Sequence, residues 1–191
     1  MRKSLVMCVL MISLLLVGCA GKGNGTPMDR ALELRGEYLS ANGCAARVQV
    51  TADYGQRVYD YGLDVQIGGG ETVLTVRQPA EIAGITARLR DGESLLEYDG
   101  AVLETGPLSE DGLTPLTAVT ALFEAMRNGF IDSCGTQGEE LYILCREPEK
   151  RVGDGREIAL WVGADGCLRR GEVFVDGRRV MGCEFASFAL N

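Results

Sequence analysis

The first segment with a regular pattern of apolar residues has a helical period. Residues 28–40 fit a short amphipathic helix, with Asp29 near its start and Asn42–Gly43 at its end. Two faces of this helix are apolar enough to be buried, and the pattern leaves both open: Met28, Leu32, Arg35 and Leu39, or Ala31, Leu34 and Tyr38.

The period then falls from 3.6 to two, which is typical of strands with one buried and one solvated face. In "RVQVTADY", residues 47–54, the apolar side consists of Val48, Val50, Ala52 and Tyr54. In "RVYDYGLDVQI", residues 57–67, it consists of Tyr59, Tyr61, Leu63, Val65 and Ile67.

Turn sequences recur between short apolar runs over the rest of the chain. Asp-Gly suits tight hairpins because both residues tolerate positive φ angles. The pairs are Asp91-Gly92, Asp99-Gly100, Asp111-Gly112, Asp154-Gly155, Asp165-Gly166 and Asp176-Gly177. The pattern predicts a mainly β (α+β) fold, an antiparallel meander of roughly eight to eleven strands, which should curl or close into a half-barrel.

One helix interrupts this meander, in "GLTPLTAVTALFEAMRNGF", residues 112–130. Thr114 suits the N-cap, Pro115 the first helical position and Gly129 the C-terminal stop. The apolar stripe is Val119, Leu122, Phe123 and Met126. We expect the helix to cover the concave side of the sheet, where this stripe either completes a core or lines a cavity.

The N-terminus has the features of a bacterial export signal. Basic Arg2 and Lys3 precede an apolar stretch, and Leu16-Val17-Gly18-Cys19 resembles a lipobox, in which the cysteine is acylated and becomes the new N-terminus. We therefore expect a signal peptide at 1–18, a lipidated Cys19 with a flexible tether at 19–27, and one domain at 28–191. The alternative is an ordinary signal peptide with an incidental cysteine.

The charge of the chain argues against some partners. The formal net charge is -8, and removal of the two basic residues of the signal peptide leaves -10. Such an acidic domain is a poor ligand for nucleic acid or anionic lipid headgroups. We expect its membrane contact to come from the lipid, with the domain in the aqueous phase.

The residue types needed for most catalytic sites are missing. The sequence has no histidine, so Ser-His-Asp and Cys-His arrangements and histidine zinc sites are excluded. Its many carboxylates lie mostly in turns or alternate with apolar residues, which indicates a solvated face. The glycines at 68–70 suit a hairpin turn better than a phosphate loop. We expect no enzyme activity and no cofactor.

Five cysteines remain outside the signal segment: Cys44, Cys134, Cys145, Cys167 and Cys183. Their number is odd and no CxxC occurs, so burial as small apolar side chains is the default, although one disulfide stays open. A tight hairpin at Asp176-Gly177 would place Cys183 opposite Arg170. It would place Cys167 opposite Ala186, so the two cysteines would not be partners.

The segment from Leu74 to Ile131 resembles the germination lipoproteins related to GerS of spore-forming clostridia. The matching words are Leu74-Thr75-Val76 leading to Pro79, Ile82-Ala83-Gly84-Ile85-Thr86-Ala87, Tyr98-Asp99-Gly100, Thr105-Gly106-Pro107-Leu108, and Leu113 with Thr114-Pro115. Those proteins are related in fold to the LolA and LolB lipoprotein carriers, so the resemblance implies a curved half-barrel with helices packed in its concave side.

The resemblance also implies a function. By this resemblance, the chain would be a non-catalytic lipoprotein anchored to the outer face of the cell or forespore membrane. It would bind and support a CwlD-type N-acetylmuramoyl-L-alanine amidase that acts on the spore cortex. Zinc and catalysis would belong to the partner, and a homodimer formed by strand exchange stays open. The alternative is a LolA-like carrier that holds lipid or lipoprotein acyl chains in an apolar cavity lined by Val119, Leu122, Phe123 and Met126.

Overall fold

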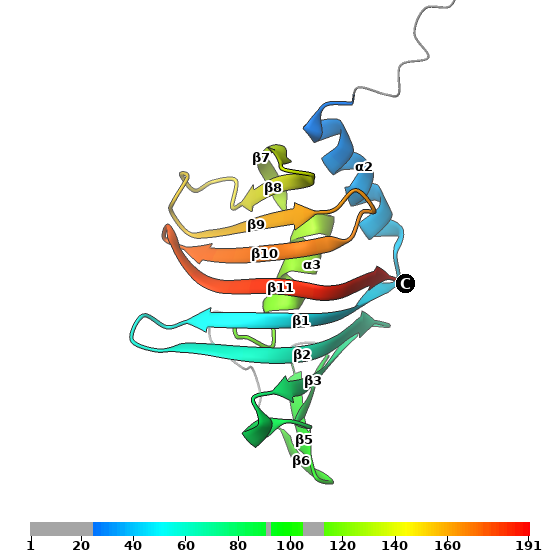
Figure 1. The fold of residues 1–191 in the computed structure, drawn as a ribbon, viewed down its shortest axis with the longest axis vertical. Coiled ribbons are helices and arrows are strands. Elements are labelled where there is room, and N and C mark those ends of the chain that lie inside the picture. The colour runs from blue at the N-terminus through cyan, green and yellow to red at the C-terminus, as the bar shows by residue number, and fades with distance from the viewer. Residues whose placement is uncertain (1–24, 91–92, 105–112) are drawn as a thin grey trace, which may run out of the picture.

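The computed structural model describes residues 25–90, 93–104 and 113–191, and these form one curved antiparallel sheet with two helices (Figure 1). The helices are α2 (Pro27–Ser40) and α3 (Ala118–Asn128), with a 3-10 turn, η1, at Ala80–Ile82. The strands are β1 (Gly43–Asp53), β2 (Val58–Gly68), β3 (Glu71–Gln78), β4 (Thr86–Arg90), β5 (Glu93–Tyr98), β6 (Ala101–Glu104), β7 (Phe130–Gln137), β8 (Glu140–Arg146), β9 (Arg156–Val162), β10 (Leu168–Val175) and β11 (Arg178–Leu190).

The sheet consists of two meanders joined at its middle. Its strand order is β6-β5-β4-β3-β2-β1-β11-β10-β9-β8-β7. Within each meander, neighbours along the chain pair with each other, and β6 and β7 lie at opposite edges. The two meanders join where the first strand pairs with the last, with Cys44 opposite Leu190 and Ala52 opposite Met181. The predicted fold class is therefore confirmed.

Two of the predicted Asp-Gly pairs form tight hairpins, whereas Asp154-Gly155 and Asp165-Gly166 lie in longer loops without positive φ at the aspartate. Asp99 and Gly100 both have positive φ, as do Asp176 and Gly177, so each pair fits the type I′ turn that matches strand twist. Gly69 and Gly70 make the same kind of turn between β2 and β3. The Asp-Gly pairs at 91–92 and 111–112 lie outside the described residues.

Helix α2 begins one residue earlier than predicted, at Pro27, because Thr26 forms a full capping box. The Thr26 hydroxyl accepts the amide of Asp29 at 3.2 Å, and the Asp29 carboxylate accepts the amide of Thr26 at 2.8 Å. Of the two faces that the sequence left open, the structure buries Ala31, Leu34 and Tyr38.

Helix α3 begins later than predicted, at Ala118 rather than after Thr114. Thr114 instead opens a separate turn in front of the helix. Its hydroxyl accepts the amide of Thr117 at 3.2 Å, and the Thr117 hydroxyl accepts the amide of Thr114 at 2.7 Å. Pro115 therefore starts this turn and not α3 itself. The C-terminal stop lies at Gly129, whose amide donates to the Ala125 carbonyl.

The predicted register of the last hairpin is wrong by one residue. A β-bulge between Val173 and Phe174 inserts an extra residue, so Cys183 pairs with Gly171 instead of Arg170. All five cysteines in the described residues are free: Cys44, Cys145 and Cys183 are buried, and Cys134 and Cys167 are half-buried.

Gly171 of β10 lies directly against Leu122 of α3. A Cβ built at Gly171 would lie 2.3 Å from Cδ1 of Leu122, which is fully buried and has no room to move. We expect Gly171→Ala to lower the free energy of unfolding by about 1 to 3 kcal/mol through overpacking. Denaturant unfolding of Gly171→Ala, Leu122→Ala and the double variant measures this. Additive effects in the double variant would contradict the contact.

Candidate binding surface

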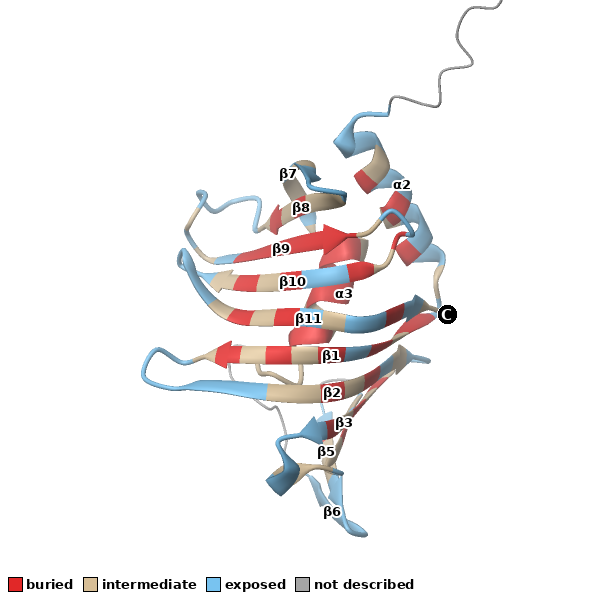
Figure 2. Ribbon diagram, in the orientation of Figure 1, coloured by how far each residue is buried: buried red, intermediate tan, exposed pale blue. Residues whose placement is uncertain are grey.

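The concave side of the sheet is filled by side chains from both helices. Buried residues concentrate on α3 and on the strands in front of it (Figure 2). The stripe predicted on α3 lies in this core, with exposed fractions of 0% for Val119, Leu122 and Phe123 and 2% for Met126. These four side chains of α3 therefore belong to the hydrophobic core between the helix and the sheet.

Tyr38 joins the two helices to the last strand. Its ring centroid lies 5.9 Å from that of Phe123 in α3 and 5.8 Å from that of Phe188 in β11. Its hydroxyl donates to the Gly166 carbonyl at 3.0 Å, which satisfies a fully buried polar group. Burial raises the pKa of Tyr38, so the phenol stays neutral.

The ends of β1, β10 and β11 that point away from α2 carry an open groove of 760 Å³. Its walls come from four regions: the end of β1, the residue Leu113 before α3, the loop leading into β9, and the β10–β11 hairpin. The lining residues are Asp53, Tyr54, Leu113, Glu147, Gly155, Arg156, Val175, Asp176, Arg178, Val180 and Met181. We call this the tip groove.

Tyr54 lines the tip groove, and Tyr59 and Tyr61 of β2 stand next to it on the β1–β2 hairpin. The ring centroids of Tyr54 and Tyr59 are 6.0 Å apart, and those of Tyr59 and Tyr61 are 6.4 Å apart. Burial raises the pKa of Tyr54, and the neighbouring Tyr61 and Tyr59 raise it further. The sequence pattern predicted that all three would be buried. Tyr59 does lie on the core side of the sheet, opposite buried Ala52, but Tyr54 and Tyr59 are 52% and 39% exposed because the hairpin extends past the helices.

The tip groove carries mixed charge. Among the described residues, Arg156 and Arg178 have no carboxylate within 4 Å. Asp53 and Asp176 accept backbone amides of Gly55 and Gly155, which holds both turns in place. Exposed tyrosines beside unpaired arginines are the residue types that dominate protein interfaces.

The opposite, convex face carries an aromatic cluster on β8–β10. The Arg170 guanidinium lies 3.8 Å from the ring centroid of Trp161, and Trp161 donates its indole N–H to Gln137 at 2.8 Å. Tyr142 packs beside it, with ring centroids 5.1 Å apart. Trp161 is only 6% exposed, because the neighbouring side chains cover its ring on the convex face. We therefore assign this cluster a structural role.

The thiols are poor nucleophiles. Burial raises the pKa of Cys44 and Cys183 to about 12 and that of Cys145 to about 11. A thiol must lose its proton to attack, so these cysteines are unreactive at neutral pH. In the part of the chain that the structure describes, no cluster of three or more His, Cys, Asp or Glu side chains could hold a metal ion.

Cys19, the predicted lipidation site, lies outside the described residues, so lipidation stays a prediction. Within residues 25–90, 93–104 and 113–191, the structure contains no helix that is both long and apolar enough to cross a membrane.

Comparison with known proteins places this chain beside several solved structures. No protein-family model matches the sequence, and no curated protein matches it. The chain is similar to a LolA superfamily protein from Nitrosomonas europaea, with 10% identity over 87% of this chain and 94% of that one and a TM-score of 0.44. It is also similar to a chain in the structure of the CwlD amidase from Clostridioides difficile in complex with the GerS lipoprotein. That match has 14% identity over 89% of this chain and 99% of that one, with a TM-score of 0.45.

A third similar structure is the lipoprotein LppX of Mycobacterium tuberculosis, at 14% identity over 83% of this chain and 93% of that one, with a TM-score of 0.44. The identities are too low to transfer the activity or the partner of any of these proteins.

Sequence reasoning missed the tip groove. Its tyrosines follow the same alternation as core residues, and alternation identifies a face without showing whether anything covers it. The turn at residues 54–57 could have indicated that these tyrosines are exposed, because side chains next to a hairpin turn lie at the end of the sheet.

Proposed function

We propose that this chain is an exported, lipid-anchored and non-catalytic protein that binds a CwlD-type N-acetylmuramoyl-L-alanine amidase at the cell envelope. The observation that carries the proposal is the filled concave side of the sheet. Phe123, Leu122 and Tyr38 occupy the space under the helices, where a carrier would need an open apolar cavity for acyl chains. A domain with a packed interior acts through its surface.

The partner in this proposal comes from the sequence resemblance to the GerS-related lipoproteins. The chemistry of the chain agrees with a supporting role: its sequence has no histidine, and its buried thiols are protonated at neutral pH. Zinc and catalysis then belong to the amidase. The tip groove supplies the binding surface, with aromatic rings for apolar contact and two arginines for carboxylates of the partner.

The direct test is to mix the detergent-solubilised mature chain with the CwlD-type amidase of the same genome. We expect co-elution at about micromolar concentration, a range normal for specific complexes, and no amidase activity from this chain alone. Absence of a complex, together with fatty acid recovered from the purified chain, would instead support the LolA-like carrier.

The tyrosines give a sharper prediction. The double variant Tyr54→Ala and Tyr59→Ala is expected to weaken amidase binding by about tenfold or more, because truncated aromatic anchors typically cost over 1 kcal/mol each. Titration by calorimetry measures the affinity. The matched control is Tyr98→Ala, which removes a tyrosine of similar exposure, 53%, from the end of β5. Equal loss in both variants would rule out the tip groove as the interface.

A further inference from the structure

Helix α2 has apolar side chains on two neighbouring faces, and the domain buries only one. Ala31 and Tyr38, on the buried face, are 1% and 0% exposed. The other face carries Met28, Leu32 and Leu39, which remain 37%, 53% and 47% exposed, although the Met28 sulfur also contacts the Cys134 thiol of β7 at 3.9 Å. At about 100° per residue, these three lie within about 40° of one another around the helix axis. They form a continuous stripe, which we call the outer stripe.

The helix is held firmly in this orientation. Arg35 lies between the two faces and donates to the carbonyls of Met126 at 3.1 Å and Gly129 at 2.6 Å. The Tyr38 hydroxyl fixes the other end through Gly166. The charged side chains Arg30, Glu33 and Glu37 pair with one another on the remaining face. Rotation of α2 to bury the outer stripe would break these contacts.

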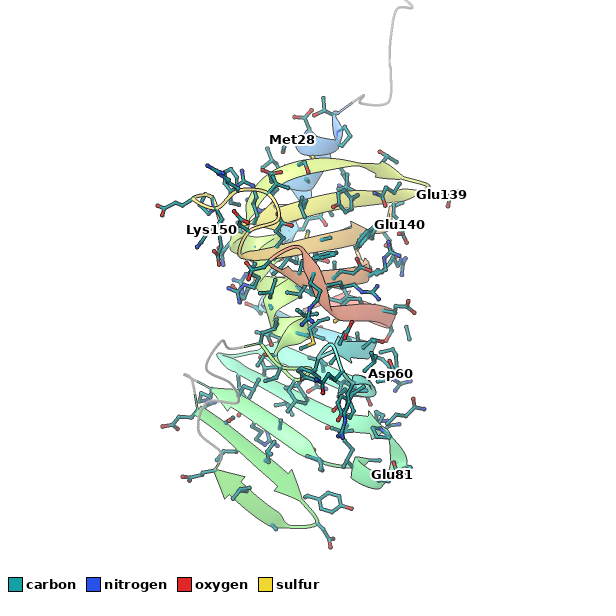
Figure 3. The ribbon with its side chains drawn as sticks, turned by 90° about the vertical axis from the view of Figure 1, so that its left-hand side faces the viewer. Met28, Asp60, Glu81, Glu139, Glu140 and Lys150 are labelled. Atoms are coloured by element: carbon teal, nitrogen blue, oxygen red, sulfur yellow. The ribbon has the colours of Figure 1, made fainter. Side chains whose placement is uncertain are left out.

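The length of chain before α2 limits what can cover the outer stripe. Seven residues, Ala20 to Thr26, separate the predicted lipidation site Cys19 from the first helical residue. Fully extended, they span at most about 25 Å. The first turn of α2 therefore stays within that distance of any bilayer that holds acyl chains on Cys19. Met28 lies in this turn, at one end of the molecule (Figure 3).

We propose that the outer stripe of α2 lies in the headgroup region of the bilayer that anchors Cys19. This inference rests on the lipid anchor of the proposed function. Three partly exposed apolar side chains give too little buried area for stable binding by themselves. A short link to the membrane turns their binding into an intramolecular step at high effective concentration, so a weak contact suffices.

Electrostatics sets the lipid preference of this contact. Helix α2 carries Asp29, Glu33 and Glu37 against Arg30 and Arg35, and the chain without the signal peptide has a net charge of -10. The apolar stripe therefore docks in spite of repulsion from anionic headgroups. Docking on anionic vesicles should strengthen with added salt, which screens the repulsion, whereas docking on neutral vesicles should not change. This revises the expectation that lipid alone contacts the membrane.

The contact would orient the domain. Figure 1 shows α2 at the right-hand ends of the strands, whereas the β1–β2 hairpin tip lies at the left-hand ends. With the outer stripe on the bilayer, the tip groove points away from the membrane and stays open to a partner.

The test places a tryptophan probe either in the outer stripe or on the polar face of α2. Leu32→Trp puts the probe in the outer stripe, and Glu33→Trp puts it on the polar face, where the native side chain is 67% exposed. The full lipidated chain is reconstituted in phosphatidylcholine vesicles with and without brominated acyl chains. The wild-type chain gives the background fluorescence of Trp161, which is 6% exposed and is subtracted from both variants.

We expect brominated lipid to remove about half of the emission of the probe at position 32 and little from the probe at position 33, because interfacial helices insert only about 5 to 10 Å. Equal quenching at both positions, in a chain shown by mass spectrometry to be acylated, would overturn this inference alone. A chain recovered without acyl groups on Cys19 would overturn the anchor and the inference together. An unquenched probe in a chain that elutes as a dimer would assign the stripe to a second copy and also overturn it.

Discussion

Phe123→Ala is expected to lower the free energy of unfolding by about 3 to 5 kcal/mol, the range for a fully buried aromatic ring. Phe123 is 0% exposed and packs against Tyr38 with ring centroids 5.9 Å apart. Its removal leaves a cavity between both helices and the sheet, where the fixed backbone prevents collapse. Chemical denaturation followed by circular dichroism measures the change.

Phe130→Ala is the matched control for this prediction. Phe130 is 48% exposed, and its ring forms a cation–π pair with the Arg146 guanidinium, 5.5 Å from the centroid. We expect a cost of less than about 1 kcal/mol. If Phe123→Ala costs no more than Phe130→Ala, the concave side contains unfilled space, and the carrier alternative becomes the better reading of the fold.

Cys19→Ala is expected to move the protein from the membrane fraction to the soluble fraction. Each buried methylene contributes about 0.8 kcal/mol, so two or more acyl chains hold a protein stably on a bilayer. The outer stripe of α2 cannot replace them once the link that keeps it near the membrane is gone. Cell fractionation with an antibody against the chain measures the distribution.

Cys8→Ala is the control for this variant. It removes a cysteine from the same N-terminal segment but leaves Leu16-Val17-Gly18-Cys19 intact, so the protein should stay in the membrane fraction. A wild-type protein that is already soluble would refute the lipid anchor, and with it the first step of the proposed function.

Local patterns predicted the elements of this fold well. The alternation around Val48 and Leu63 predicted β1 and β2, and the Asp-Gly pairs at 99–100 and 176–177 predicted two hairpin turns. These features depend on residues close in the chain, whose backbone preferences act over a few positions.

Some predictions from the local pattern failed. The β-bulge at Val173 shifted the register of Cys183, and the turn at Thr114 delayed the start of α3. The exposure of Tyr54 arises because no helix reaches the end of the β1–β2 hairpin. In each case the local pattern was compatible with two arrangements. The hydrogen bonds between Thr114 and Thr117 selected one of them at the start of α3.

The sequence by itself determined which segments are strands or helices, where the chain turns, and which catalytic groups it cannot build, because each of these depends on composition or on adjacent residues. Only the tertiary structure decided that β1 pairs with β11 and that α2 buries Leu34 while leaving Leu32 exposed. It also decided that Leu122 fills the space above Gly171. These outcomes depend on contacts between residues far apart in the chain. Because the core is close-packed, the position of each side chain depends on all the elements that surround it.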